Sequence, residues 1–166
     1  MDFIPFEQIE DLSASLNQLS DAEIESLLNQ FMEEQPHLVA YLTAIGEDDF
    51  TDEEHETLLT LGMELWYILK SIVPPLPLLS EEAIDQADQD NEENLGFLRD
   101  ADRQNQAEAI EQLAEEYPQG DILVFIFAVL DSEDEDGIPL LEDESVLGDM
   151  FLALKTVLDG LLAQLT

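Results

Sequence analysis

The sequence predicts an all-α fold of about eight helices arranged as two similar halves. Three observations favour this fold. Apolar residues recur at helical spacing along most of the chain, prolines and glycines divide it into helix-length segments, and three segments recur in order after about 84 residues. The 166 residues suit one domain, and the 45% hydrophobic content is enough to build a core.

Two helices are expected in the first 35 residues. Apolar residues from Phe6 to about Gln18 fall on one face of a helix. Ser20, followed three residues later by Glu23, forms a capping box that begins a second helix. Pro36 ends this second helix, because proline cannot donate the backbone hydrogen bond that a helix interior needs.

A short helix and a long helix are expected next, and a stiff connector after them. The segment 38–45 is mostly apolar, and Gly46 suits the position just after a helix. Thr51 and Glu54 form a second capping box, which begins the long helix. Three prolines in 74–79 stop that helix and predict the connector.

The second half begins at Ser80, a predicted N-cap residue. The acidic segment 81–94 has few apolar residues, so its structure is left open. Helical spacing resumes at 95–98 and either continues or restarts through 109–113, and a last helix is expected from about Leu141 to Gln164. Taken alone, the apolar run 122–130 is compatible with a buried strand or a buried helix.

An internal repeat favours the helix for that run. Three segments of the first half match segments of the second half at spacings of 82, 84 and 85 residues: 31–36 with 113–118, 38–45 with 122–129, and 65–72 with 150–157. We therefore expect a duplication, and the run 122–130 should be helical like 38–45. The expected organisation is a first half over 1–73, the connector over 74–79 and a second half over 80–166, packed as one cooperative domain.

The composition excludes several classes of protein. The chain has 41 acidic residues, four lysines and arginines, and a formal net charge of -37, so direct binding of nucleic acid or of an anionic membrane is not expected. It has no cysteine, which excludes disulfides and cysteine-ligated metals. The start of the chain lacks the basic region of a secretory signal, and the longest apolar run is too short to span a membrane. We expect a soluble cytoplasmic protein.

Metal sites have only weak candidates. The loop 132–137 resembles part of a calcium-binding loop, with Asp134 and Asp136 in ligand positions, but the last position falls on Asp143 where such loops use a bidentate glutamate. Glu34 and His37 have the spacing of a di-iron motif, but a proline between them breaks the helix that the motif requires. No cofactor is expected.

No pattern indicates an enzyme. The chain has no G-x-S-x-G elbow and no glycine-rich phosphate loop, and its carboxylates are too numerous for one acid–base pair to stand out. The few cations have structural explanations. Lys70 and Lys155 lie late in their expected helices, where a cation is favourable, and Arg99 and Arg103 are expected to tie the acidic middle segment to a neighbour.

Three acidic clusters, at 47–56, 81–93 and 131–144, carry much of the charge. Two of them occupy the same loop of the two repeats, so a pseudo-two-fold arrangement would place them symmetrically. The candidate partner-binding residues form an acidic face composed of Glu47, Asp48, Asp49, Asp52, Glu53, Asp131, Glu133, Asp134, Glu135 and Asp136.

We therefore expect a non-enzymatic interaction protein whose acidic face engages a basic protein, with nucleic-acid mimicry or inhibition as one form of this role. Two alternatives remain. The acidity could be an adaptation for solubility or high salt, or the carboxylates could bind calcium or a di-metal centre. The sequence does not determine the oligomeric state or the identity of the partner.

Overall fold

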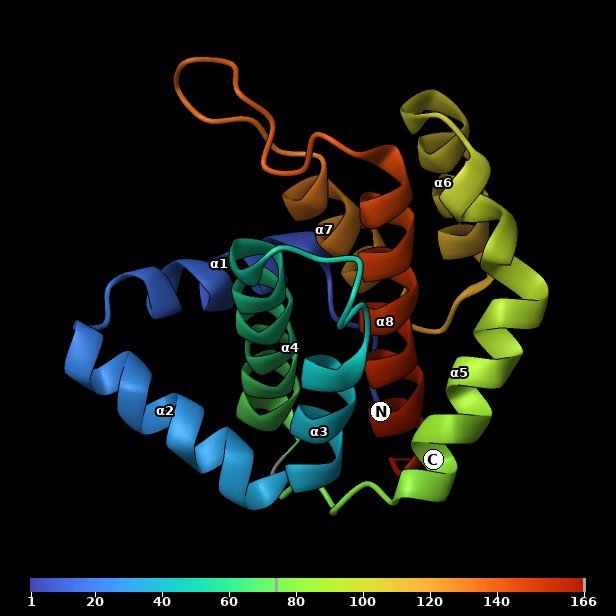
Figure 1. Ribbon diagram of the computed structural model, residues 1–166. Coiled ribbons are helices and arrows are strands. Elements are labelled where there is room, and N and C mark those ends of the chain that lie inside the picture. Colours follow the sequence, from blue (N-terminus) through green and yellow to red (C-terminus); the bar gives the residue numbers. More distant parts are fainter. Residues whose placement is uncertain (74, 166) are drawn as a thin grey trace.

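A computed structural model describes residues 1–73 and 75–165 (Figure 1). Pro74, in the expected connector, and Thr166 lie outside the described residues. The described chain is a single all-α domain of eight α-helices and one 3₁₀-helix: α1 (Phe6–Asn17), α2 (Asp21–Glu34), α3 (Pro36–Ala44), α4 (Asp52–Ile72), α5 (Glu81–Leu95), η1 (Gly96–Asp100), α6 (Arg103–Glu116), α7 (Gly120–Leu130) and α8 (Glu144–Ala163). Over these residues it has no β-strand, and the only pairing of that kind is an isolated bridge between Glu133 and Pro139.

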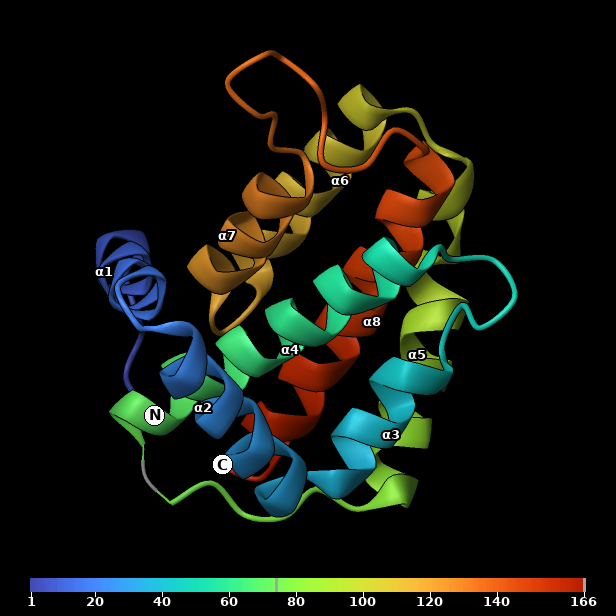
Figure 2. The ribbon, with the colours of Figure 1, turned by 60° about the vertical axis from the view of Figure 1, so that its left-hand side comes forward.

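Helices α4 and α8 form the centre of the fold and run side by side in the same direction (Figures 1 and 2). Most residues of α8 from Val146 to Leu161 are buried, because α4, α5, α7 and η1 all pack against it. On α4, Trp66 is fully buried and its ring lies 5.2 Å from that of Phe31 on α2. The acidic loops that precede α4 and α8 therefore lie at the same end of the molecule.

Helices that are far apart in the sequence pack against each other. Helix α1 lies against α7, where the rings of Phe6 and Phe125 meet edge to face at 6.2 Å. Helix α5 lies against α3 and along α8, and the Tyr41 hydroxyl of α3 donates a 2.7 Å hydrogen bond to Asp88 of α5. These contacts place α5 close to the loop that follows α3.

The helix starts follow the sequence closely. The capping boxes at Ser20 and Thr51 are both formed, with Glu23 and Glu54 as the reciprocal partners. Ser80 accepts a hydrogen bond from the third residue of α5 and so confirms its predicted role. The apolar run 122–130 lies in helix α7, as the repeat predicted, and most of its apolar residues are buried.

Two segments that the sequence left open are decided by the structure, and one helix start differs from expectation. The undecided segment 81–94 is helical, as most of α5. Between 95 and 113 the helix restarts, because η1 follows α5 and Asp102 then caps the start of α6 by accepting a hydrogen bond from Asn105. The last helix begins at Glu144 and not near Leu141, because Asp143 caps its first turn.

The segments 31–72 and 113–157 contain the same succession of elements: the end of a helix, a short apolar helix, an acidic loop and a long helix. This succession agrees with the expected repeat, while a duplication as its origin stays a prediction. No helix in the described part of the chain is long and apolar enough to cross a membrane.

Candidate functional site: an acidic groove

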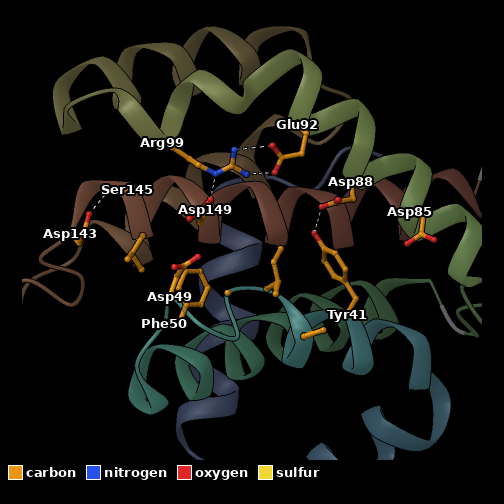
Figure 3. Close-up of a pocket in the computed structure, with 14 residues that line it drawn as sticks. Tyr41, Asp49, Phe50, Asp85, Asp88, Glu92, Arg99, Asp143, Ser145 and Asp149 are labelled. Atoms are coloured by element: carbon orange, nitrogen blue, oxygen red, sulfur yellow. Dashed lines mark hydrogen bonds and ion pairs between the residues drawn. The ribbon is translucent and has the colours of Figure 1, made fainter.

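An open groove of about 840 Å³ lies between α3, the loop that follows it, α5 and the start of α8 (Figure 3). We call it the acidic groove, because six carboxylates and one guanidinium line it. Its lining residues are Tyr41, Ala44, Ile45, Gly46, Asp49, Phe50, Asp85, Asp88, Glu92, Arg99, Asp143, Ser145, Val146 and Asp149.

One wall of the acidic groove is a row of carboxylates on α5. Asp85, Asp88 and Glu92 are spaced i, i+3 and i+7, so they lie on one side of the helix over about 10 Å. Ile84 and Asn91, which are buried, occupy the side of α5 that packs against the rest of the protein. The same helical period that buries the apolar side of α5 therefore directs this row of charges into the groove.

The opposite wall is the loop between α3 and α4, which a tight turn holds in place. Gly46 has a φ of 67°, and the backbone amides of Asp49 and Phe50 donate to its carbonyl at 2.9 and 2.8 Å. A ring nitrogen of His55 lies 3.0 Å from the carbonyl oxygen of Ile45. These contacts bury the Phe50 ring under the loop and leave the Asp49 carboxylate exposed at the groove wall.

Arg99 crosses the top of the groove from η1 and joins two helices (Figure 3). Its guanidinium donates to both carboxylate oxygens of Glu92 on α5, and its Nε donates to Asp149 on α8. The hydrogen bond with Glu92 raises the pKa of Arg99 above its ordinary value, and the pKa of Glu92 is lowered in return. This confirms that Arg99 ties the acidic middle segment to a neighbour.

Tyr41 supplies the aromatic part of the groove. Burial raises the pKa of its phenol well above the ordinary value, and the hydrogen bond to the Asp88 carboxylate adds to that effect. Tyr41 therefore remains a neutral hydrogen-bond donor at neutral pH. Ile45, Phe50 and Val146 provide apolar surface beside it, so the groove combines apolar lining with negative walls.

A buried polar network lies behind α5. Lys155 of α8 donates to Asn91 at 2.7 Å and to Asp159 at 2.8 Å, and its Nζ lies over the Tyr117 ring. Tyr117 donates in turn to Asp159. This network fixes α5 against α8 and so sets the position of the carboxylate row.

All four lysines and arginines of the chain are engaged in ion pairs within it. Lys70 contacts Glu34 at 2.6 Å and lies over the Trp66 ring, and the other three pairs are Arg99 with Glu92 and Asp149, Arg103 with Asp131, and Lys155 with Asp159. The carboxylates of the groove other than those that hold Arg99 thus have no cationic side chain of this protein left to neutralise them.

The structure divides the expected acidic face. From the first loop, Asp49 lines the groove, Glu47 and Asp48 are exposed beside it, and Asp52 and Glu53 lie in the first turn of α4. The second loop projects from the molecule as a small hairpin (Figures 1 and 2), and none of its expected residues lines the groove: Asp131, Glu133, Asp134, Glu135 and Asp136. The two loops share one end of the molecule without forming one site.

The second loop is closed by its own contacts. The Asp134 carboxylate accepts hydrogen bonds from the amides of Asp136 and Ile138, both at 2.9 Å. At the base, Arg103 donates to the Asp131 carboxylate at 2.7 Å and to the carbonyl oxygen of Leu141. Arg103 therefore fastens the hairpin, although sequence reasoning had assigned it to the acidic middle segment.

The weak metal candidates are not brought together. Asp143 caps α8, while Asp134 is occupied within the hairpin turn. Across residues 1–73 and 75–165, no group of three or more histidines, aspartates and glutamates has the arrangement of a metal site. His37, on α3, forms a 3.3 Å contact with Glu81 at the start of α5. It therefore does not form a metal-binding cluster with Glu34.

Several groove residues were not singled out from the sequence. Asp85, Asp88 and Glu92 lie in the segment whose structure was left open, and their i, i+3, i+7 spacing is a signal only once that segment is known to be helical. Tyr41 lies in an apolar helical stripe, a pattern typical of core residues, and in the structure it is half-buried with its hydroxyl bonded to Asp88 in the groove wall.

Comparison of the chain with models of protein families, with curated proteins and with solved structures finds no match.

Proposed function

We propose that the protein is a non-enzymatic interaction protein that binds a basic protein partner, and that the acidic groove is its binding site. The observation that carries this proposal is the imbalance within the groove, where six carboxylates face a single guanidinium already held by two of them. The carboxylates of Asp49 and Asp85 have no hydrogen-bond or ion-pair partner among the described residues, so they are available to a partner's cations.

Charge of this kind favours fast and salt-sensitive association. A cleft lined by one sign of charge concentrates the opposite charge near it, and mobile ions screen the effect over about 8 Å at physiological ionic strength. A second copy of this chain is a poor occupant, because its lysines and arginines are all engaged in their own ion pairs. The site therefore favours a different, cationic protein.

The proposal is tested with a fluorescent oligo-arginine peptide, whose binding is followed by anisotropy across a salt series starting at about 50 mM. The groove variant is Asp49→Asn with Asp85→Asn. The control variant is Asp11→Asn with Glu25→Gln, two exposed carboxylates on α1 and α2, which changes the net charge by the same amount. We expect the groove variant to weaken binding about tenfold at low salt, and the control variant to weaken it less than twofold.

Two results would contradict the proposal. Absence of binding at the lowest salt would remove the interaction role. If the groove and control variants weakened peptide binding equally, the peptide would be attracted by the net charge of the whole protein and not by the groove. An adaptation for solubility or high salt predicts this result. If nucleic-acid mimicry is the form of the function, a DNA duplex and this protein should compete for the same basic partner.

A further inference from the structure

We infer that the partner of the acidic groove presents an amphipathic α-helix, with arginines along one side and apolar residues beside them. This inference rests on the proposed function and adds the conformation and chemistry of the segment that is bound. It follows from the spacing of the carboxylates, from the apolar lining between the walls, and from the way in which the protein already holds one arginine.

The spacing of the carboxylate row favours a helical occupant. Asp85, Asp88 and Glu92 span two helical turns, with steps of about 4.5 and 6 Å along the axis. Arg99 already occupies the Glu92 step, so a partner's cations would face Asp85 and Asp88, and cations at i and i+3 of a partner helix have the same step. Side chains on one side of an extended strand recur about every 7 Å, so a strand would match this row less well.

The apolar lining distinguishes the groove from a simple negative surface. Tyr41 and Ile45, which are half-buried, line it between the α5 row and the α3–α4 loop, and the almost fully buried Phe50 and Val146 add the small part of their surface that remains exposed. A purely cationic peptide would leave this surface in water, whereas a helix with an apolar stripe would cover it. Recognition of an amphipathic helix in a groove uses the same two elements, apolar anchors and charge at the rim.

Arg99 shows how these walls hold a guanidinium. It makes a two-pronged contact with Glu92 and a further hydrogen bond to Asp149, which together satisfy three of its donors. Such planar, paired contacts suit arginine and are not available to the single ammonium of lysine. Asp85 and Asp88 continue the same wall, where the Asp88 carboxylate accepts one hydrogen bond, from Tyr41, so a partner's arginines would meet these two carboxylates on α5.

The test compares two peptides of about 16 residues and identical composition, built from arginine, leucine and alanine. In the first peptide the arginines and leucines form adjacent helical stripes, and in the second their order is scrambled so that no stripe forms. A third peptide carries lysines in place of the arginines of the first. Binding is measured by calorimetry at low and high salt, and helix formation by circular dichroism.

We expect the striped peptide to bind at least fivefold more tightly than the scrambled peptide, to become helical on binding, and to keep more of its affinity at high salt. The lysine peptide should bind several-fold more weakly than the striped arginine peptide. Equal binding of the striped and scrambled peptides, with both weakened by Asp49→Asn and Asp85→Asn, would overturn this inference and leave the proposed function standing. Absence of binding by every peptide would overturn both.

A variant that blocks the groove without changing its charge locates the bound peptide. Ala44 is exposed and lines the groove, so Ala44→Trp should weaken binding of the striped peptide about tenfold, while Ala14→Trp on α1 should not. In case Ala44→Trp perturbs folding, methyl NMR of the unaltered protein gives a second measurement. Striped peptide should shift the methyl signals of Ile45 and Val146 and leave those of Ile138 unchanged, and the reverse pattern would place the helix elsewhere.

Discussion

Gln35 and Gln119 hold two distant segments of the chain in the same way. Each is a buried glutamine that directly precedes a short apolar helix, α3 or α7, with nearly the same backbone angles. The side chain of Gln35 donates to the carbonyl of Pro77 at 2.8 Å and accepts from the amide of Leu79 at 3.0 Å. One amide group thus secures the extended segment that leads into α5.

Gln119 repeats this arrangement at the other end of the chain. Its side chain donates to the carbonyl of Asp2 at 3.0 Å and accepts from the amide of Ile4 at 2.9 Å, and so secures the segment that leads into α1. Each short helix therefore fixes the start of a helix from the opposite part of the sequence. Since α5 forms one wall of the acidic groove, the contact made by Gln35 also positions that wall.

Replacement of either glutamine should destabilise the fold by a similar amount. Gln35→Leu leaves the buried amide of Leu79 without a partner, and Gln119→Leu does the same to Ile4, so each should lower the free energy of unfolding by about 2 to 4 kcal/mol. Urea denaturation measures the change, and Gln8→Leu on the exposed side of α1 serves as the control. A loss below about 0.5 kcal/mol at either site would show that water replaces the amide there.

The two lysines on the central helices should differ sharply in their contribution to stability. Lys155 is buried and its loss leaves Asp159 and Asn91 without their cation, so Lys155→Met should cost about 3 to 5 kcal/mol. Lys70 and its partner Glu34 are both partly exposed, so Lys70→Met should cost about 1 kcal/mol or less. Thermal and urea unfolding of the two variants compare them directly, and equal losses would contradict the role given to the buried network.

Glu64 should lower the free energy of unfolding as pH rises. A carboxylate that is held in an ion pair has the opposite effect. Burial on α4 raises its pKa, and the hydrogen bond from Ser13 offsets this only in part. Its charged form is therefore less favourable in the folded than in the unfolded protein, so stability is lost as pH rises through the folded pKa. Glu64→Gln should stabilise the protein at pH 7 and have no such effect near pH 3.

The matched control for this prediction is Glu56→Gln, an exposed position on the same helix. Both variants relieve the general self-repulsion of the chain equally, so only the difference between them reports on burial. Urea titrations between pH 3 and 7 measure that difference. A constant difference across this range would mean that the substitution acts through packing and not through the charge of Glu64.

Gly120 is required by the close approach of α7 to the end of α6. A Cβ atom at this position would lie 2.1 Å from the backbone carbonyl oxygen of Ala114, which cannot move without displacing α6. At Gly160 the nearest atom is the end of the Leu79 side chain, which can rotate away. Gly120→Ala should therefore cost at least about 2 kcal/mol and Gly160→Ala clearly less, as measured by urea denaturation.

Calcium should not bind tightly to the hairpin between α7 and α8. The Asp134 carboxylate is engaged with two backbone amides, and Asp143 accepts the hydrogen bond that begins α8, so a calcium ion would have to displace both contacts. Calorimetry with calcium in the presence of excess magnesium measures this. A saturable site with micromolar affinity, lost in Asp134→Asn, would restore the carboxylate metal-binding alternative.

Local features of the sequence predicted most of the helices. The capping residues Ser20 and Thr51 mark helix starts because their side chains satisfy backbone amides within three residues, a contact that depends on no other part of the fold. The segment 81–94 was left open because it has few apolar residues, and its buried side includes Asn91, which is hydrogen-bonded to Lys155, 64 residues away. The pairing of that helix with α8 is not encoded locally.

The sequence by itself determined the class of the fold and the sign of the surface charge, because helical periodicity and composition are properties of neighbouring residues and of simple counts. Only the tertiary structure decided which carboxylates act together. It separated Asp49 from Asp134, which the sequence had grouped on one face, and brought Asp49 to the same groove as Asp85. This grouping depends on how α3, α5 and α8 pack, and packing joins residues through contacts that span most of the chain.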